Sequence, residues 1–210
     1  RSDGRLTTPD EETWGEKRTC SELVHLYCLS PILQAAEIFH RDDWKKAAEE
    51  ILRYYKTEYY DAIMNFDLLS HFYAYVMEAL LDLGEIDMAR EAMAKIASIQ
   101  TAEGAVPGYH DVHWVCSTGL FQLALVWFRL GEIEHGDLAF QYACKLQNAS
   151  GGWYGSYPVE GDNTNDYFPA AEISWTAKYF LDALYYKNKA DFNKSAPLFM
   201  DKIDKTDGRY

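Results

Sequence analysis

Aromatic, acidic and imidazole side chains gather near the starts of several predicted helices and in the loops before them. The residues that could hold a ligand are His25, Asp67, His71, Tyr109, Asp111, His113, Trp114, Trp153, Glu172 and Trp175. Aromatic rings pack against the C–H faces of sugars, while carboxylates and imidazoles form hydrogen bonds with the hydroxyl groups. The pattern therefore predicts a binding site for a saccharide or a similar small molecule.

Catalysis is a second function that the same residue types allow. A carboxylate pair such as Asp111 and Glu172 would supply the acid and the base of glycoside cleavage, provided that their separation suits that reaction. A histidine such as His71 or His113 beside Tyr73 or Tyr109 would move protons as in a polysaccharide lyase. The catalytic candidates are His71, His113 and Glu172, and the sequence leaves open whether any of them acts in catalysis.

Several of these residues also have a purely structural interpretation. Asp67 and Glu172 lie near predicted helix starts, where a carboxylate satisfies free N–H groups and the helix dipole. His25 and His71 each open a predicted helix with the pattern His-x-Tyr, which is also typical of hydrogen-bonded core residues in repeated helices. Sequence alone does not decide between these roles and ligand binding.

The metal and cofactor patterns in the sequence are incomplete. The motif His110-x-x-His113-x-x-Cys116 offers zinc donors, but no second cluster has matching spacing. A calcium-loop pattern that begins at Asp162 fails because Tyr167 stands where the turn glycine belongs. A glycine-rich phosphate loop and a nucleophile elbow are both missing from the sequence. We therefore expect no metal and no cofactor.

An internal repeat predicts how the candidate residues are positioned. Residues 66–109 recur in the next segment at an offset of 47, so that Leu-Gly-Glu-Ile at 83–86 returns at 130–133. Apolar residues at three- and four-residue steps indicate two helices in each copy, and Gly84 ends the first of them. Such a hairpin buries its apolar faces only by stacking on its neighbours.

Stacked hairpins form an all-α fold, and we predict an α/α toroid or solenoid of about four hairpins, with an incomplete ring as one form. Residues 1–18 are polar and are predicted as an extended lead-in, and residues 19–210 as a single hairpin-repeat domain. The first predicted hairpin has a helix over 21–40, kinked at Pro31, and a helix over 44–57, capped by Asp42 and Asp43. After residue 99, helices are predicted from about 115, over 132–147 and from 171, with a weaker one at 193–205.

Two loops lie between the predicted hairpins, at residues 101–114 and 148–170. Both are rich in glycine, proline and aromatic residues, as turns require. The second is too long for a simple connection, and loops of that length are usually functional. Both lie at the same end of the predicted stack, so that end is the expected site.

Charge and hydropathy exclude several classes of partner. The formal net charge is −13 and the pI is near 4.8, which argues against binding to nucleic acid or to anionic membranes. The sequence has neither an apolar run of roughly 18 residues nor a signal peptide, so we expect a cytoplasmic protein. An unfinished hairpin stack would leave an apolar edge, which predicts a homodimer as one arrangement.

One segment resembles the Gln-Trp repeats of the terpenoid cyclase and protein prenyltransferase toroids. It is QNASGGWYGSY, residues 147–157, which contains Trp153. The aspartate-rich motif of the cyclases and the zinc ligands of the prenyltransferases have no clear counterpart in this chain. The resemblance therefore implies the toroid fold but not isoprenoid chemistry.

A second resemblance covers about residues 21–210. The segments that carry it are SELVHLYCLSPIL, NFDLLSHFYAYVMEAL, DVHWVCSTGLFQLALVW, QNASGGWYGSY, EISWTAKYFLDA and the terminal DGRY. Together they are similar to the helical toroid region that precedes a methyltransferase domain in some bacterial fusion proteins. The resemblance implies that this chain is the partner of a methyltransferase domain in a longer protein.

Overall fold

The computed structural model describes residues 22–159 and 161–203, with side chains as far as Asp191. This part of the chain is mostly helical, with eight α-helices, one 3-10 helix and one two-stranded sheet. The predicted all-α class is confirmed at this level. The predicted lead-in at residues 1–18 lies outside the described residues. The elements are η1 (Glu22–Cys28), α2 (Leu29–Ile38), α3 (Asp42–Glu58), α4 (Tyr60–Met64), α5 (Ser70–Asp82), α6 (Ile86–Ile99), β1 (Val115–Cys116), α7 (Ser117–Leu130), α8 (Ile133–Lys145), β2 (Ser156–Tyr157) and α9 (Ser174–Ile203).

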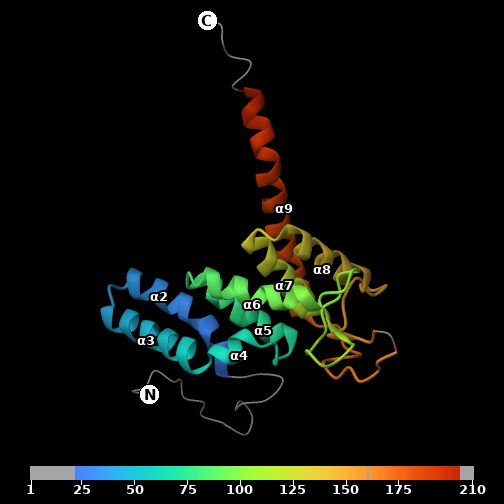
Figure 1. Cartoon of the computed structure of the whole chain (residues 1–210), viewed down its shortest axis with the longest axis horizontal. Helices are drawn as coiled ribbons and strands as arrows, with labels where there is room; N and C mark the ends of the chain where they lie inside the picture. The colour runs from blue at the N-terminus through green and yellow to red at the C-terminus, as the bar shows by residue number, and fades with distance from the viewer. Residues whose placement is uncertain (1–21, 160, 204–210) are drawn as a thin grey trace, which may run out of the picture.

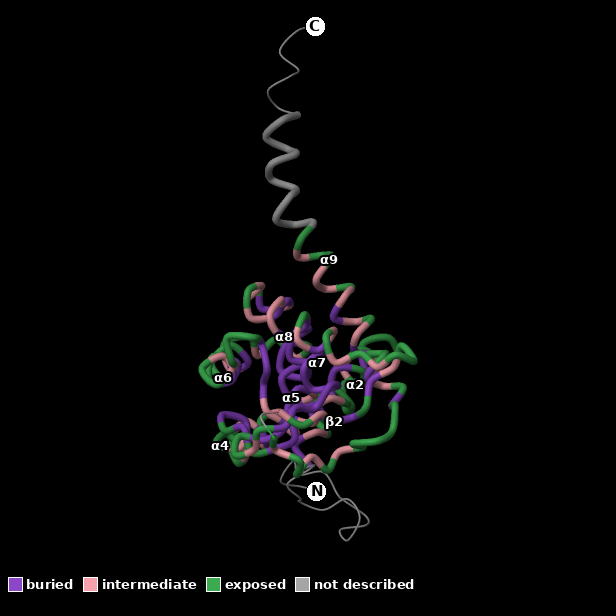
Figure 2. Tube along the Cα trace, turned by 90° about the vertical axis from the view of Figure 1, so that its right-hand side faces the viewer, coloured by how far each residue is buried: buried purple, intermediate pink, exposed green. Residues whose placement is uncertain are grey.

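Helix α7 lies at the centre of the molecule, and all of its residues except Arg129 are buried. It packs against α5, α8 and α9, while η1 packs against α5 and α2 pairs with α3. Figure 1 shows α2 and α3 at one end of the molecular body and α8 with the start of α9 at the other. In Figure 2 the buried residues concentrate around α5 and α7.

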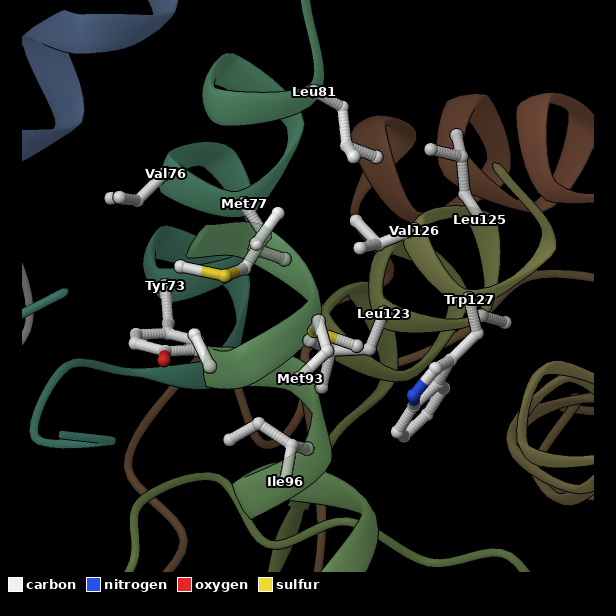
Figure 3. Close-up of a cluster of buried hydrophobic side chains, with 14 of the residues drawn as sticks. Tyr73, Val76, Met77, Leu81, Met93, Ile96, Leu123, Leu125, Val126 and Trp127 are labelled. Atoms are coloured by element: carbon white, nitrogen blue, oxygen red, sulfur yellow. The ribbon is translucent and has the colours of Figure 1, made fainter. Parts of the chain in front are cut away.

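The apolar face of α5 forms the core together with α6 and α7. Tyr73, Val76 and Leu80 follow the predicted three- and four-residue spacing and are fully buried. The close-up in Figure 3 shows how the three helices contribute side chains to one cluster. The residues labelled in it are Tyr73, Val76, Met77, Leu81, Met93, Ile96, Leu123, Leu125, Val126 and Trp127.

The turns after α5 and α7 have the same backbone conformation. Gly84 and Gly131 have φ values of +81° and +79°, which a residue with a Cβ atom rarely adopts. The next N–H group bonds back to the carbonyl five residues earlier in both turns, from Glu85 to Leu80 at 2.8 Å and from Glu132 to Trp127 at 2.9 Å. The prediction that Gly84 ends its helix is confirmed.

The first predicted hairpin differs in detail from the structure. Instead of one helix over 21–40, the 3-10 helix η1 is followed by α2, and the change at Cys28 precedes Pro31. Pro31 lies in the first turn of α2, where a missing N–H group breaks no helical hydrogen bond. The predicted capping by Asp42 and Asp43 is wrong, since both belong to the first turn of α3 and Asp43 pairs with Arg41 at 2.5 Å.

The fourth predicted hairpin is also wrong as far as the described residues extend. Residues 174–203 form one uninterrupted helix, α9, rather than an inner helix followed by a separate weaker one. The segment 184–196 contains neither glycine nor proline, and the helix continues past Pro197, which lacks the N–H group of a helical hydrogen bond. Figures 1 and 2 show that α9 continues beyond the body of the molecule. Residues 204 and 205 lie outside the described part.

A short sheet joins the two loops that the sequence singled out. Strand β1 pairs antiparallel with β2, with Val115 opposite Tyr157 and Cys116 opposite Ser156. Val115 was expected near the start of a helix, but α7 begins only at Ser117, whose N–H group bonds to the Gly155 carbonyl at 3.1 Å. The loop 148–170 is therefore fastened to the start of α7.

Candidate functional site

Helix α5 carries a polar stripe on the side that faces α7 and α9. His71, Tyr75, Glu78 and Asp82 follow one another at steps of four, three and four residues, which places them on one face of the helix. His71 and Glu78 are only 4% and 6% exposed. Two titratable side chains are therefore held between packed helices rather than in water.

Gln122 of α7 connects these two side chains. Its Nε2 donates a hydrogen bond to Glu78 Oε1 at 2.5 Å, and its Oε1 lies 2.8 Å from Nδ1 of His71. Because the amide NH₂ group is used by Glu78, the amide oxygen must accept from His71, which assigns the imidazole proton to Nδ1. Nε2 of His71 is then a hydrogen-bond acceptor.

Burial makes His71 a neutral side chain at physiological pH. Loss of solvation lowers its pKa from 6.5 to about 4, although the hydrogen bond that it donates to Gln122 raises it. The positive charge of Lys178 lowers it further. An unprotonated imidazole is able to accept a proton or a hydrogen bond through Nε2.

The same burial has the opposite effect on the acidic partner. Loss of solvation raises the pKa of Glu78 from 4.5 to about 7, against the lowering effects of the Gln122 hydrogen bond and of Lys178 and Arg129. Glu78 therefore changes its charge near neutral pH. Two adjacent groups whose pKa values are displaced in this way are typical of functional sites.

Three tyrosines surround this pair. The ring of Tyr75 lies 4.8 Å from that of His71, 4.9 Å from that of Tyr27 on η1 and 5.9 Å from that of Tyr179 on α9. Tyr27 and Tyr75 are half-buried, whereas Tyr179 is buried. Burial, then the charge of Glu78, then a hydrogen bond with Tyr75 raise the pKa of Tyr179. We refer to His71, Tyr75, Glu78, Gln122 and Tyr179 as the buried polar cluster.

Lys178 stands at the solvent side of the buried polar cluster. Its Nζ lies 3.7 Å from the centre of the Tyr179 ring, which is a cation–π distance. Its side chain is half exposed, and Nζ also pairs with Asp182 at 2.8 Å. The lysine therefore has two partners, one inside the cluster and one at the surface.

The long loop supplies a further aromatic wall through Tyr167. The Tyr167 ring lies 6.1 Å from that of His71, and its hydroxyl accepts a hydrogen bond from Nε1 of Trp175 at 3.2 Å. The next residue, Phe168, has a φ of +48°, which is uncommon for a residue other than glycine. Such backbone conformations concentrate at functional sites.

Tyr167 brings together four of the residues predicted from sequence. His71 and Trp175 both contact it, as described above, and Tyr109 and Trp114 belong to the apolar cluster against which it packs. Tyr109 and Trp114 are buried and meet edge to face, with ring centres 5.5 Å apart. Three of the predicted aromatic residues, Tyr109, Trp114 and Trp175, are thus connected with His71 through Tyr167.

The other predicted residues lie away from His71 or have different partners. His25 is exposed, and Asp67, also exposed, is 3.3 Å from His110. Asp111 and His113 are exposed, and the backbone N–H of His113 bonds to Asp162 at 2.9 Å. His25 and His71 do not share the environment that their common His-x-Tyr pattern predicted.

Glu172 and Trp153 have structural partners. The carboxylate of Glu172 accepts hydrogen bonds from Ser150 and from Asn148, the latter at 2.9 Å, and both lower its pKa. Trp153 is buried, and its Nε1 donates to the carbonyl of Ala143 at 2.9 Å. Trp153 therefore packs in the core, and Glu172 fastens its own loop.

Sequence analysis missed most of the buried polar cluster. Tyr75, Glu78, Gln122, Lys178 and Tyr179 were not among the candidates. One signal was available: Gln122 is a polar residue at the centre of the apolar run that became α7. A second was the four-, three-residue spacing from His71 through Tyr75 to Glu78, which places all three on one helical face.

A separate hollow lies elsewhere in the part of the chain that the structure describes. It has a volume of about 820 Å³ and is open to solvent, between α2, the start of α3 and the end of α5. Its lining mixes acidic and basic side chains and includes Asp82 but no member of the buried polar cluster. We place the site at the cluster, because there the titratable groups are buried and bonded to one another.

The zinc pattern of the sequence does not converge in space. Cys116 is buried, which raises the pKa of its thiol, and Nδ1 of His110 lies near Asp67 and the carbonyl of Phe66. Within residues 22–159 and 161–203, no three histidine, cysteine or acidic side chains are grouped as metal ligands would be.

None of the helices in the described residues is long and apolar enough to cross a bilayer. The family resemblances noted in the sequence stay predictions. Comparison with protein-family models, with curated proteins and with solved structures finds no match to this chain.

Proposed function

We propose that this protein binds a polar small molecule, most suitably a saccharide, at the buried polar cluster between α5, α7 and α9. The observation that carries the proposal is the hydrogen-bonded chain from His71 through Gln122 to Glu78, placed next to the half-buried ring of Tyr75. The hydrogen-bonded chain offers a ligand both an acceptor and an ionisable carboxylate.

The energetic cost of this arrangement supports a functional role. A buried carboxylic acid, an amide and an imidazole cost free energy even when they are hydrogen-bonded, and apolar residues of similar size often do as well or better. Helices α5 and α7 already have apolar contacts with each other and with α6. Packing of these helices alone therefore gives no reason for three polar residues at the contact.

The aromatic residues favour a sugar over other polar ligands. The rings of Tyr75 and Tyr167 both lie near His71, and they connect it to the half-buried Tyr27 and to Trp175. Rings of this kind pack on the C–H faces of a sugar ring, while His71 and Glu78 are suited to its hydroxyl groups.

We also infer that the helices follow an α/α toroid or solenoid plan with an incomplete ring. In this plan η1, α5, α7 and α9 are the inner helices and α3, α6 and α8 the outer ones. The packing of η1 on α5, of α5 on α7 and of α7 on α9 supports it, as do the matching turns at Gly84 and Gly131. The buried polar cluster then lies on the inner helices.

Catalysis on the same ligand is a second candidate. A glutamate with a pKa of about 7 beside a neutral histidine is a suitable acid and base pair for glycosidic bond cleavage. In this alternative Glu78, rather than Glu172 as the sequence suggested, is the acidic residue of a carbohydrate-active enzyme. Glu172 is instead hydrogen-bonded to Ser150 and Asn148.

A calorimetric screen of the whole chain against oligosaccharides, including uronates, tests the proposal. We expect one saccharide to bind, with affinity reduced about tenfold or more by Tyr75→Ala and by Glu78→Gln. Glu91→Gln, on the exposed face of α6, is the matched control and leaves affinity unchanged. Unaltered saccharide binding by both cluster variants, with circular dichroism showing them folded, would refute the site.

The same samples test the second candidate and the predicted partnership. Release of reducing ends or of unsaturated uronate products, lost in Glu78→Gln, would establish an enzyme. The link to a methyltransferase and the homodimer stay predictions, and S-adenosylmethionine is included as a probe that this chain is expected not to bind.

A further inference from the structure

The ammonium group of Lys178 occupies a position that suits a cation from outside the chain. It lies 3.7 Å from the centre of the Tyr179 ring, and that ring belongs to a buried side chain. Its charge acts on Tyr27 and Glu78, so it stands among aromatic and acidic groups of the cluster. A cation is therefore already favoured at this place by the protein itself.

The tyrosines around this position form an aromatic enclosure. The rings of Tyr27 and Tyr75 meet at 73° and those of Tyr75 and Tyr179 at 80°, with centres 4.9 Å and 5.9 Å apart. These rings pack edge to face, and the charge of a carboxylate acts on both Tyr27 and Tyr179. Ring faces and a nearby acid both attract positive charge, as in the aromatic sites that bind organic ammonium groups. Glu78 is the carboxylate here.

We infer that the ligand of this site carries a positively charged group, such as the ammonium of an amino sugar, which takes the place of the Lys178 ammonium. The inference rests on the proposed saccharide site and specifies its ligand. Neutral and acidic sugars would lack the group that the enclosure attracts.

Displacement of Lys178 is structurally inexpensive because a second partner is present. Asp182 lies one helical turn further along α9, 2.8 Å from the lysine Nζ, and both side chains reach solvent. When a ligand cation enters, Lys178 keeps its ion pair with Asp182 and gives up only its contact with the ring. The Lys178 ammonium thus competes with the ligand cation for the position over the Tyr179 ring.

Calorimetry with one pair of ligands tests this inference. The probes are a trisaccharide of β-1,4-linked glucosamine and its fully N-acetylated form, at pH 7, where both the free amines and Glu78 are charged in part. We expect the amine form to bind about tenfold more tightly. Lys178→Met, which removes the resident cation, is expected to raise the affinity for the amine form several-fold, whereas Lys189→Met, an exposed lysine on the same helix, leaves it unchanged.

The possible outcomes separate this inference from the proposed function. Equal affinity for the two trisaccharides, or weaker binding of the amine form by Lys178→Met, overturns the cationic ligand while the saccharide site stands. Loss of the preference in Glu78→Gln with retained binding of the N-acetylated form supports it. Binding of neither form, by the wild type or by Lys178→Met, counts against both.

Discussion

Gln122 on α7 donates a hydrogen bond to Glu78 on α5 at 2.5 Å, and both side chains are buried. The same amide accepts from His71, so one uncharged residue satisfies two titratable ones. Helix packing alone would not require this bridge, and its removal leaves both neighbours without a partner on α7.

Replacing Gln122 with leucine is therefore expected to destabilise the protein by about 2–4 kcal/mol, since it leaves a buried carboxyl group and a buried imidazole unsatisfied. Urea unfolding monitored by circular dichroism measures the change. Gln141→Leu, at an exposed position of α8, is the control and should change stability by less than about 0.5 kcal/mol. A loss for Gln122→Leu as small as that of the control would show that the bridge contributes nothing.

The buried polar cluster also predicts an unusual pH dependence of stability. The folded-state pKa of Glu78 is raised from 4.5 to about 7, so its contribution is full below pH 4.5 and is lost as the pH rises through about 7. The pKa of His71 is lowered from 6.5 to about 4, so its contribution is full above pH 6.5 and is lost as the pH falls through about 4. Between about pH 4.5 and 6.5 the two changes oppose each other, and wild-type stability should show little dependence on this pair.

Single substitutions should reveal the two opposed effects. In Glu78→Gln the free energy of unfolding should fall by about 3 kcal/mol as the pH is lowered from 6.5 to 4, because only His71 titrates. In His71→Gln it should fall by a similar amount as the pH is raised from 4.5 to 7. Urea unfolding at several pH values measures both. Parallel pH profiles for the two variants would contradict the assigned protonation states.

Gly84 and Gly131 should be equally sensitive to alanine. Both have positive φ values, and a Cβ atom at either would meet nothing within 4 Å, so the cost is conformational alone. We expect each substitution to lower stability by about 1 kcal/mol, measured by thermal or urea unfolding. Clearly unequal costs would indicate that the two turns are not equivalent in solution.

Gly155 should tolerate alanine much less well than Gly152. A Cβ atom at Gly155 would lie 2.5 Å from the backbone oxygen of Tyr167, whereas at Gly152 its nearest neighbour is the end of the Glu172 side chain. We expect Gly155→Ala to cost about 1–3 kcal/mol and to weaken ligand binding by displacing Tyr167, and Gly152→Ala to cost less than about 0.5 kcal/mol. Unfolding curves and calorimetry on both variants decide this; comparable costs would contradict the tight packing at Gly155.

Local features of the fold could be predicted from sequence because they depend on neighbouring residues. The apolar spacing of Tyr73, Val76 and Leu80 and the left-handed Gly84 are examples. The 3-10 conformation of η1 could not be predicted, since it depends on packing against α5. A 3-10 helix has three residues per turn, so its side chains point in different directions from those of an α-helix. For this reason His25 is exposed although its sequence pattern matches that of the buried His71.

The candidate site was harder to predict because its members come from distant parts of the chain. The charge state of Glu78 depends on burial by helices that follow it by some 40 to 100 residues, and on a bond to Gln122. The sequence identified His71, Tyr109, Trp114 and Trp175, which the structure connects through Tyr167. Glu172 lies near them in sequence but bonds to Ser150 and Asn148.

Helix α9 connects the candidate site to a segment that lies outside the body of the molecule. Lys178 and Tyr179 lie in its first two turns, where the helix packs on α7, while the far end extends away from the body (Figures 1 and 2). At 1.5 Å per residue, about 26 Å of helix separates Tyr179 from Ala196, the residue before Pro197, so a tilt of about 5° at the site moves that point by about 2 Å. A small tilt of the first turns of α9 around a bound molecule would therefore become a larger displacement further along the helix.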